Sequence, residues 1–97
     1  MTLKDFSRLK WRQSDYHVRV TAVEKITNQE LLAEIAQNDI DYHVRRAAVE
    51  RLTNQALLGE IAQKDSDYHV RRTAVKELSD QSLLSRLAQN DSNSELR

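Results

Sequence analysis

Residues 40–65 read IDYHVRRAAVERLTNQALLGEIAQKD, and this stretch has a close copy on either side. Residues 14–39 read SDYHVRVTAVEKITNQELLAEIAQND, and residues 66–91 read SDYHVRRTAVKELSDQSLLSRLAQND. The copies align with a period of 26 and no insertion or deletion, and 13 of the 26 positions are identical in all three. A fixed period of this length indicates supersecondary units that stack on one another.

Each unit contains two apolar patterns with helical spacing. Val44, Ala48 and Leu52 lie four residues apart, and Leu58 and Ile61 continue the pattern after a short polar joint. Proline is absent and the chain has one glycine, which argues against β-hairpins and glycine-rich phosphate loops. We therefore predict two helices of about 10–12 residues in each unit, neither able to bury its apolar stripe alone.

Residues that cap helices stand where the predicted helices begin. The first helix of each unit should be capped by Asp15, Asp41 and Asp67. The second should be capped by Asn28, Asn54 and Asp80, each directly after a threonine or serine.

These patterns predict one all-α domain over residues 1–97: an α-α solenoid, a right-handed superhelix of stacked helical pairs with 26-residue repeats. Residues 1–13 form a half-repeat helix, since Phe6 and Leu9 fall on the apolar positions of a second helix. The full repeats span 14–39, 40–65 and 66–91, and residues 92–97 match the start of a further unit. We expect a monomer or a part of a longer array.

The bulk composition excludes several classes of function. Fifteen basic and fifteen acidic residues cancel, so no net charge draws the chain to nucleic acid or anionic lipid. Without cysteine it can form no disulfide, thiolate metal site or iron–sulfur cluster. No apolar run is long enough to span a membrane, and no signal peptide is recognisable. We expect a cytoplasmic protein with no cofactor.

The spacing D-x-x-V-R-x-x-A-V, followed by a second helix with L-L-x-x-I/L-A, resembles the short HEAT-like repeats of the phycobilisome-lyase type. It is also similar to the variant leucine-rich repeat, although the cysteines of that protein's iron–sulfur cluster are missing here. The resemblance covers residues 14–91 and implies an Asp/Arg ladder along the stack. Proteins of this kind include scaffolds, lyases and DNA-repair proteins, so the resemblance leaves function open.

The repeated DYHVR motif places a charged pair within the apolar sector of the first helix. Its aspartate and arginine are four residues apart, and a lone buried charge is costly, so we expect them to satisfy each other. The ladder would comprise Asp15, Arg19, Asp41, Arg45, Asp67 and Arg71. The alternative is that the arginines contact phosphates.

The tyrosine and histidine of the motif fall on different sides of the helix. Tyr16, Tyr42 and Tyr68 fall at the edge of the apolar sector, where they should lie half-buried between repeats; the alternative is a base-stacking platform. The histidines fall opposite the core, which predicts solvated rings. Repeat spacing puts the outer two about 20 Å apart, too far to share one zinc ion. We expect no metal site and no catalytic residues.

Facing away from the core, the second helices carry the candidate recognition surface. In HEAT-like solenoids these helices line the concave side, and a column of small residues, Ala33 and Gly59 among them, would leave a shallow track there. Trp11 stands where the full repeats have glutamine, so it is either a binding anchor or a lid over the terminal core. The candidate partner-binding residues are Arg8, Trp11, Glu30, Glu34, Gln37, Glu60, Gln63, Arg86 and Gln89.

The sequence favours a non-enzymatic scaffold that binds a protein or peptide on its concave face. Two other functions remain as alternatives: nucleic-acid backbone binding through the stripe of Arg46 and Arg72, and a lyase or chaperone-like role implied by the resemblance alone. The partner's identity does not follow from these patterns.

Overall fold

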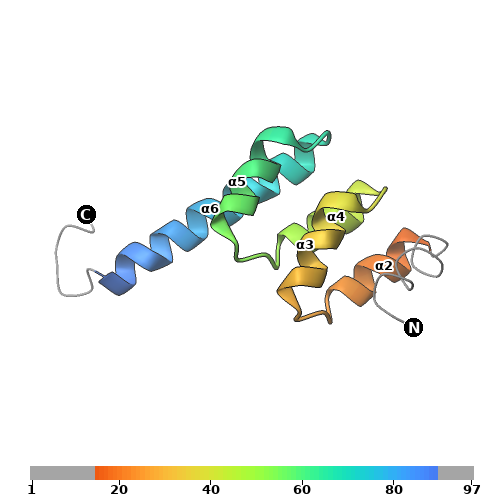
Figure 1. Ribbon diagram of the computed structural model, residues 1–97, viewed down its shortest axis with the longest axis horizontal. Helices are drawn as coiled ribbons and strands as arrows, with labels where there is room; N and C mark the ends of the chain where they lie inside the picture. Colours follow the sequence, from red (N-terminus) through yellow and green to blue (C-terminus); the bar gives the residue numbers. More distant parts are fainter. Residues whose placement is uncertain (1–14, 90–97) are drawn as a thin grey trace.

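The computed structural model describes the backbone of residues 15–89 and the side chains of residues 15–81. Over this part the chain is helical and has no strand, which confirms the predicted all-α class. The helices are α2 (Tyr16–Val23), α3 (Gln29–Asn38), α4 (Tyr42–Val49), α5 (Gln55–Lys64) and α6 (Tyr68–Gln89) (Figure 1). The predicted half-repeat over 1–13 and the fragment 92–97 lie outside the described residues.

Four predicted N-caps are confirmed. The carboxylates of Asp15 and Asp41 accept the backbone N–H two residues on, at 2.7 Å in both cases. The amide oxygens of Asn28 and Asn54 accept the N–H three residues on, at 3.0 Å. Each cap satisfies a donor that the first turn of a helix leaves without an intrahelical partner, which sets where the helix begins.

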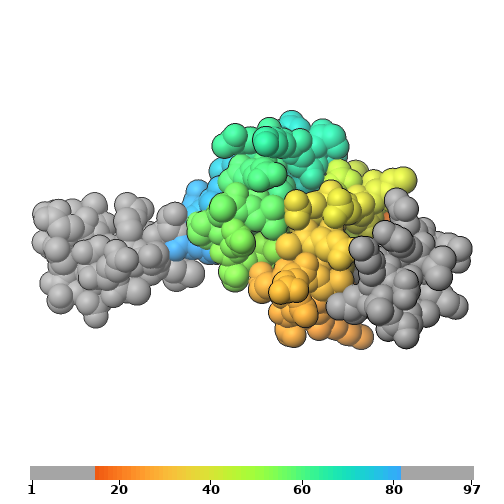
Figure 2. Space-filling view, viewed as in Figure 1, coloured from red at the N-terminus to blue at the C-terminus, as the bar shows by residue number. Residues whose placement is uncertain are grey.

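Packing joins each first helix to its neighbours. α2 packs against α4 and α4 against α6, while α3 lies against α4 and α5 against α6. Figure 2 shows the segments following one another in sequence order, from orange at the start of α3 through yellow α4 to green α5. The predicted apolar stripes supply the core: Val44, Ala48, Leu52, Leu58 and Ile61 are all buried.

The third repeat departs from the prediction. A joint at Ser79–Asp80, with Asp80 as the N-cap of a second helix, is wrong, because α6 runs through both residues as one helix of 22 residues. An ion pair from Lys76 to Asp80, at 3.5 Å and four residues apart, supports the continuous helix. The second half of α6 extends away from the other helices (Figure 1).

Hydrogen bonds between the first and second repeats hold the ends of α2 and α4. Ile26 O, near the end of α2, accepts Arg51 Nη2 at 2.8 Å, and Gln29 Nε2 donates to Arg51 O at 2.9 Å. These bonds satisfy backbone groups that a helix end exposes. No described first helix follows α6, so no corresponding contact holds a break near Ser79. The first helices α2 and α4, with eight residues each, are also shorter than predicted.

Across the described helices, none combines the length and apolar character needed to cross a membrane.

Candidate functional site

Buried ion pairs link the two helices of a repeat at one end. Arg19 Nε lies 3.0 Å from Asp39 Oδ2, and Arg45 Nε lies 3.1 Å from Asp65 Oδ2. In both pairs a second guanidinium nitrogen donates to the other carboxylate oxygen at 3.2 Å, so both pairs are bidentate. Asp39 and Asp65 directly follow α3 and α5, which places each carboxylate beside the first helix of its own repeat.

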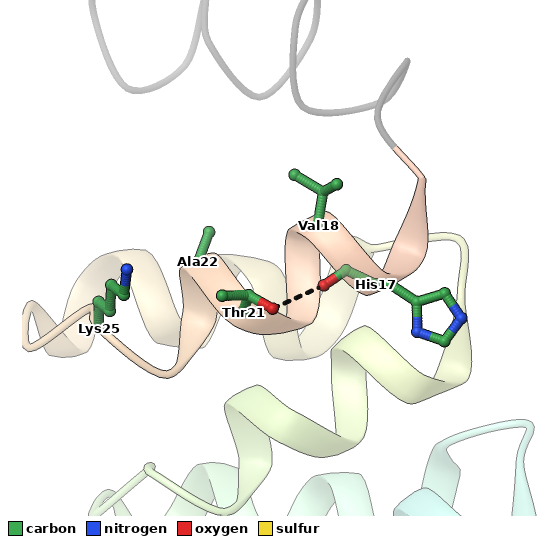
Figure 3. Close-up of a pocket in the computed structure, with 5 residues that line it drawn as sticks. All are labelled: His17, Val18, Thr21, Ala22 and Lys25. Atoms are coloured by element: carbon green, nitrogen blue, oxygen red, sulfur yellow. Dashed lines mark hydrogen bonds between the residues drawn. The ribbon is translucent and has the colours of Figure 1, made fainter.

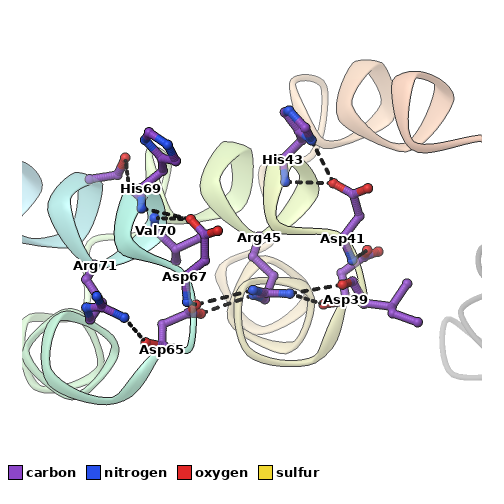
Figure 4. Close-up of polar contacts among 11 residues, drawn as sticks. Asp39, Asp41, His43, Arg45, Asp65, Asp67, His69, Val70 and Arg71 are labelled. Atoms are coloured by element: carbon purple, nitrogen blue, oxygen red, sulfur yellow. Dashed lines mark hydrogen bonds and ion pairs between the residues drawn. The ribbon is translucent and has the colours of Figure 1, made fainter.

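The same residues continue the connection into the next repeat. Arg45 Nη1 donates to Asp39 O at 2.8 Å, and Arg71 Nη1 donates to Asp65 O at 2.7 Å (Figure 4). The carboxylate of Asp39 also accepts the N–H of Asp41 at 2.9 Å. A ladder therefore runs along the described repeats, in which Asp39 and Asp65 each contact two repeats.

The predicted pairing within each motif is corrected by these contacts. Arg19 and Arg45 each pair with an aspartate 20 residues downstream, whereas Asp15 and Asp41 act as helix caps. Asp67 takes the same position before α6, where it accepts the N–H of His69 at 2.7 Å. The carboxylates of Asp15 and Asp41 accept cap hydrogen bonds at the start of their own helices. The arginines instead extend to the aspartate at the end of the second helix.

Asp41 has a second partner besides its cap bond. His43 Nδ1 lies 3.0 Å from Asp41 Oδ1. Burial alone would raise the pKa of the Asp41 carboxyl, but hydrogen bonds from the His43 backbone and ring, with the nearby Arg19 charge, lower that pKa overall. The carboxylate is thus held ionised where two repeats meet.

Tyrosine and histidine rings form a column across the joints between repeats. Tyr16 stacks on His43 of the next repeat, with ring centroids 4.5 Å apart and planes 18° apart. Tyr42 stacks in the same way on His69, at 5.8 Å and 22°. Because His43 also stacks on Tyr42 at 4.0 Å, it lies between two tyrosines. These contacts hold neighbouring first helices in register.

The tyrosine prediction is confirmed for Tyr16 and Tyr42, which are half-buried, whereas Tyr68 is 58% exposed. The predicted solvated histidine ring is confirmed for His17 and His69, which are exposed, whereas His43 is half-buried, with its side chain 40% exposed and stacked on Tyr16 and Tyr42. A helical wheel drawn for α4 alone does not include the preceding repeat, whose Tyr16 stacks on the ring of His43. Among the described residues, no three His, Cys, Asp or Glu side chains are grouped so as to hold a metal ion.

On α3 and α5, the predicted recognition residues face solvent. We call this surface the outward strip; its exposed members are Glu30, Glu34, Gln37, Ala56, Glu60 and Gln63, with Ala33 and Gly59 half-buried among them. No ion pair engages its three glutamates within the described part of the chain. A Cβ built on Gly59 would meet nothing within 4 Å, so the strip is open there.

Other predicted site residues stand apart or cannot be placed. Trp11 and Arg8 lie outside the described residues, as do the side chains of Arg86 and Gln89. Arg46 and Arg72, the alternative basic stripe, are exposed on α4 and α6.

Two kinds of functional contact were missed by sequence reasoning. The partners of the ladder, Asp39 and Asp65, end their units in the same column as Asp91, a repeated charge directly after an apolar helix. The glutamine column that begins α3 and α5 and continues at Gln81 within α6 was also overlooked; Gln81 Nε2 donates to Leu52 O at 2.9 Å, and Gln55 contacts Gln81. In both cases an identical polar residue in every copy was the available signal.

Comparison of the chain with protein-family models, with curated proteins and with solved structures finds no match.

Proposed function

We propose that the chain is a non-enzymatic α-α solenoid scaffold that binds an extended protein segment along the outward strip of α3 and α5. The observation that carries this proposal is the exposure of Glu30, Glu34 and Glu60 beside the open position at Gly59. Exposed carboxylates with no ion-pair partner among the described residues favour a segment that contains lysine or arginine.

Further support comes from the position of the strip on the sides of α3 and α5 that the core does not use. The fold's own contacts use the opposite sides of α3 and α5, where Leu32, Ile35, Leu58 and Ile61 are buried. Side chains on the strip can therefore change without loss of the core, which is the property a recognition surface needs.

The test is selection of peptides from a random library, followed by binding measured through fluorescence anisotropy. We expect the selected peptides to be basic. Glu34→Lys with Glu60→Lys should weaken binding by at least tenfold, and Gly59→Leu should weaken it by filling the open position. Glu24→Lys with Glu50→Lys, the same change of net charge at exposed positions that end α2 and α4, is the matched control and should have little effect. Selected peptides that bind all variants equally would contradict the proposal.

A second candidate is backbone-level binding of nucleic acid through Arg46 and Arg72, favoured by the exposure of both guanidinium groups. The zero net charge opposes it. Micromolar binding to a random duplex at physiological salt, lost in Arg46→Glu with Arg72→Glu, would select this function over the first.

A further inference from the structure

Within the described chain, α2 packs against α4 and α4 packs against α6, and both interfaces use the same residue columns. On one side, the forward face, a tyrosine and a valine seven residues later lie within about 20° of each other around the helix. On the other side, the back face, a histidine and the valine after it meet them. At the interface of α2 with α4, Tyr16 and Val23 belong to the forward face of α2, and His43 and Val44 belong to the back face of α4.

Burial of the two valine columns shows where this contact is made and where it is not. The forward-face valines Val23 and Val49 are fully buried, whereas Val75 of α6 is 51% exposed. The back-face valines Val44 and Val70 are also fully buried. The equivalent residue of α2, Val18, is 59% exposed.

At each end of the described array, the exposed valine belongs to a wider open surface. On α6, Tyr68 of the same forward face is 58% exposed. On α2, His17, Val18, Thr21 and Ala22 line an open depression of about 500 Å³, with Lys25 at its end (Figure 3). The α6 end therefore exposes the tyrosine and valine of a forward face, and the α2 end exposes the histidine and valine of a back face.

We propose that these two faces bind each other between copies of this chain, so that the forward face of α6 on one copy docks on the back face of α2 on the next. The partner is a second copy because each face carries the side chains that already fit its opposite at two joints within the chain. Tyr68 would stack on His17 as Tyr16 stacks on His43, and Val75 and Val18 would be buried as their equivalents are. Such a contact joins two different surfaces, so it propagates head to tail.

Sedimentation equilibrium over a series of chain concentrations tests this proposal with four variants. The unmodified chain should show a weight-average mass that rises with concentration beyond that of a dimer. Val18→Glu and Val75→Glu should each remain monomeric alone, because each lacks one face. An equimolar mixture of the two should form dimers and nothing larger, since one intact face remains on each. Combining both substitutions in one chain should abolish association.

Ile40→Glu is the matched control, since Ile40 is 79% exposed, lies between α3 and α4 and belongs to neither end face; it should associate as the unmodified chain does. Circular dichroism checks that each variant keeps its helices. If either glutamate variant loses helix, Val18→Thr and Val75→Thr keep the side-chain volume and should weaken association roughly tenfold. A chain that stays monomeric throughout, a mixture that fails to dimerise, or association lost through only one of the faces would overturn the proposal.

Discussion

Replacing Arg45 by methionine should destabilise the fold more than any other single change to a charged side chain of the second repeat. Its guanidinium makes two bonds to Asp65, at 3.1 and 3.2 Å, and two to the carbonyls of Asp39 and Ile40, at 2.8 and 3.2 Å. The side chains of Arg45 and Asp65 are only 11% and 7% exposed. Methionine keeps much of the apolar stem but leaves the Asp65 carboxylate with the N–H of Asp67 as its remaining described partner.

The magnitude follows from that geometry. Removing one partner of a buried ion pair costs about 3–5 kcal/mol, and the residual exposure of this pair places the expected loss near the lower end, at about 3 kcal/mol. With a urea m-value of roughly 1.5 kcal/mol/M for a chain of this size, the unfolding midpoint should fall by about 2 M.

Urea unfolding followed by circular dichroism measures the effect. Arg46→Met is the matched control, because Arg46 is the next residue and is exposed; it should change stability by less than about 0.5 kcal/mol. Asp65→Ala should cost less than Arg45→Met, since the two carbonyl partners of Arg45 remain, and the double variant should cost clearly less than the sum. A loss below about 0.5 kcal/mol for Arg45→Met would refute the ladder as a source of stability.

Three further perturbations test separate contacts. Asn28→Ala should lower the free energy of unfolding by about 1 kcal/mol through loss of the α3 cap, whereas the exposed Gln63→Ala should not; equal losses would contradict the cap. Folding lowers the pKa of Asp41, so the stability that this carboxylate contributes is present above its ordinary pKa of 3.8 and is lost as pH falls through the folded pKa. Asp41→Asn should therefore make the free energy of unfolding fall less steeply with acid. An unchanged dependence of that free energy on pH would count against this. Tyr42→Leu should cost roughly 0.5–1.5 kcal/mol more than Tyr68→Leu, because Tyr42 stacks across a joint and Tyr68 is exposed; similar losses in urea would disprove that difference.

What could be predicted from the sequence was mostly local. Asp15 and Asn28 were recognised as caps because a cap depends on a donor two or three residues away. The partner of Arg19 could not be recognised in this way. Asp39 comes beside it only after the chain has turned and α3 has run back, whereas helical spacing alone made Asp15 the nearest carboxylate.

The outward strip was placed correctly on exposed faces of α3 and α5, since an apolar period of 3.6 also fixes which side is polar. The predicted helix break before Asp80 was wrong. Ser79 and Asp80 have the local sequence of a cap but lack the contacts that hold the segment between α2 and α3. Helix propensity and the Lys76 pair then favour continuation.

The triple occurrence of DYHVR is explained by what each residue does at a joint. In the second copy Asp41 caps α4, Tyr42 and His43 stack on rings of the neighbouring repeats, Val44 is buried, and Arg45 binds two segments. Every position of the motif in the second copy is therefore constrained by the geometry of stacking. Several positions facing solvent on the second helices carry no such constraint, and there the copies differ, as with Glu30 and Ala56, although glutamine is kept at Gln37 and Gln63. Exchanging the outward positions that differ between α3 and α5, Glu30 with Ala56 and Ala33 with Gly59, should thus alter partner binding.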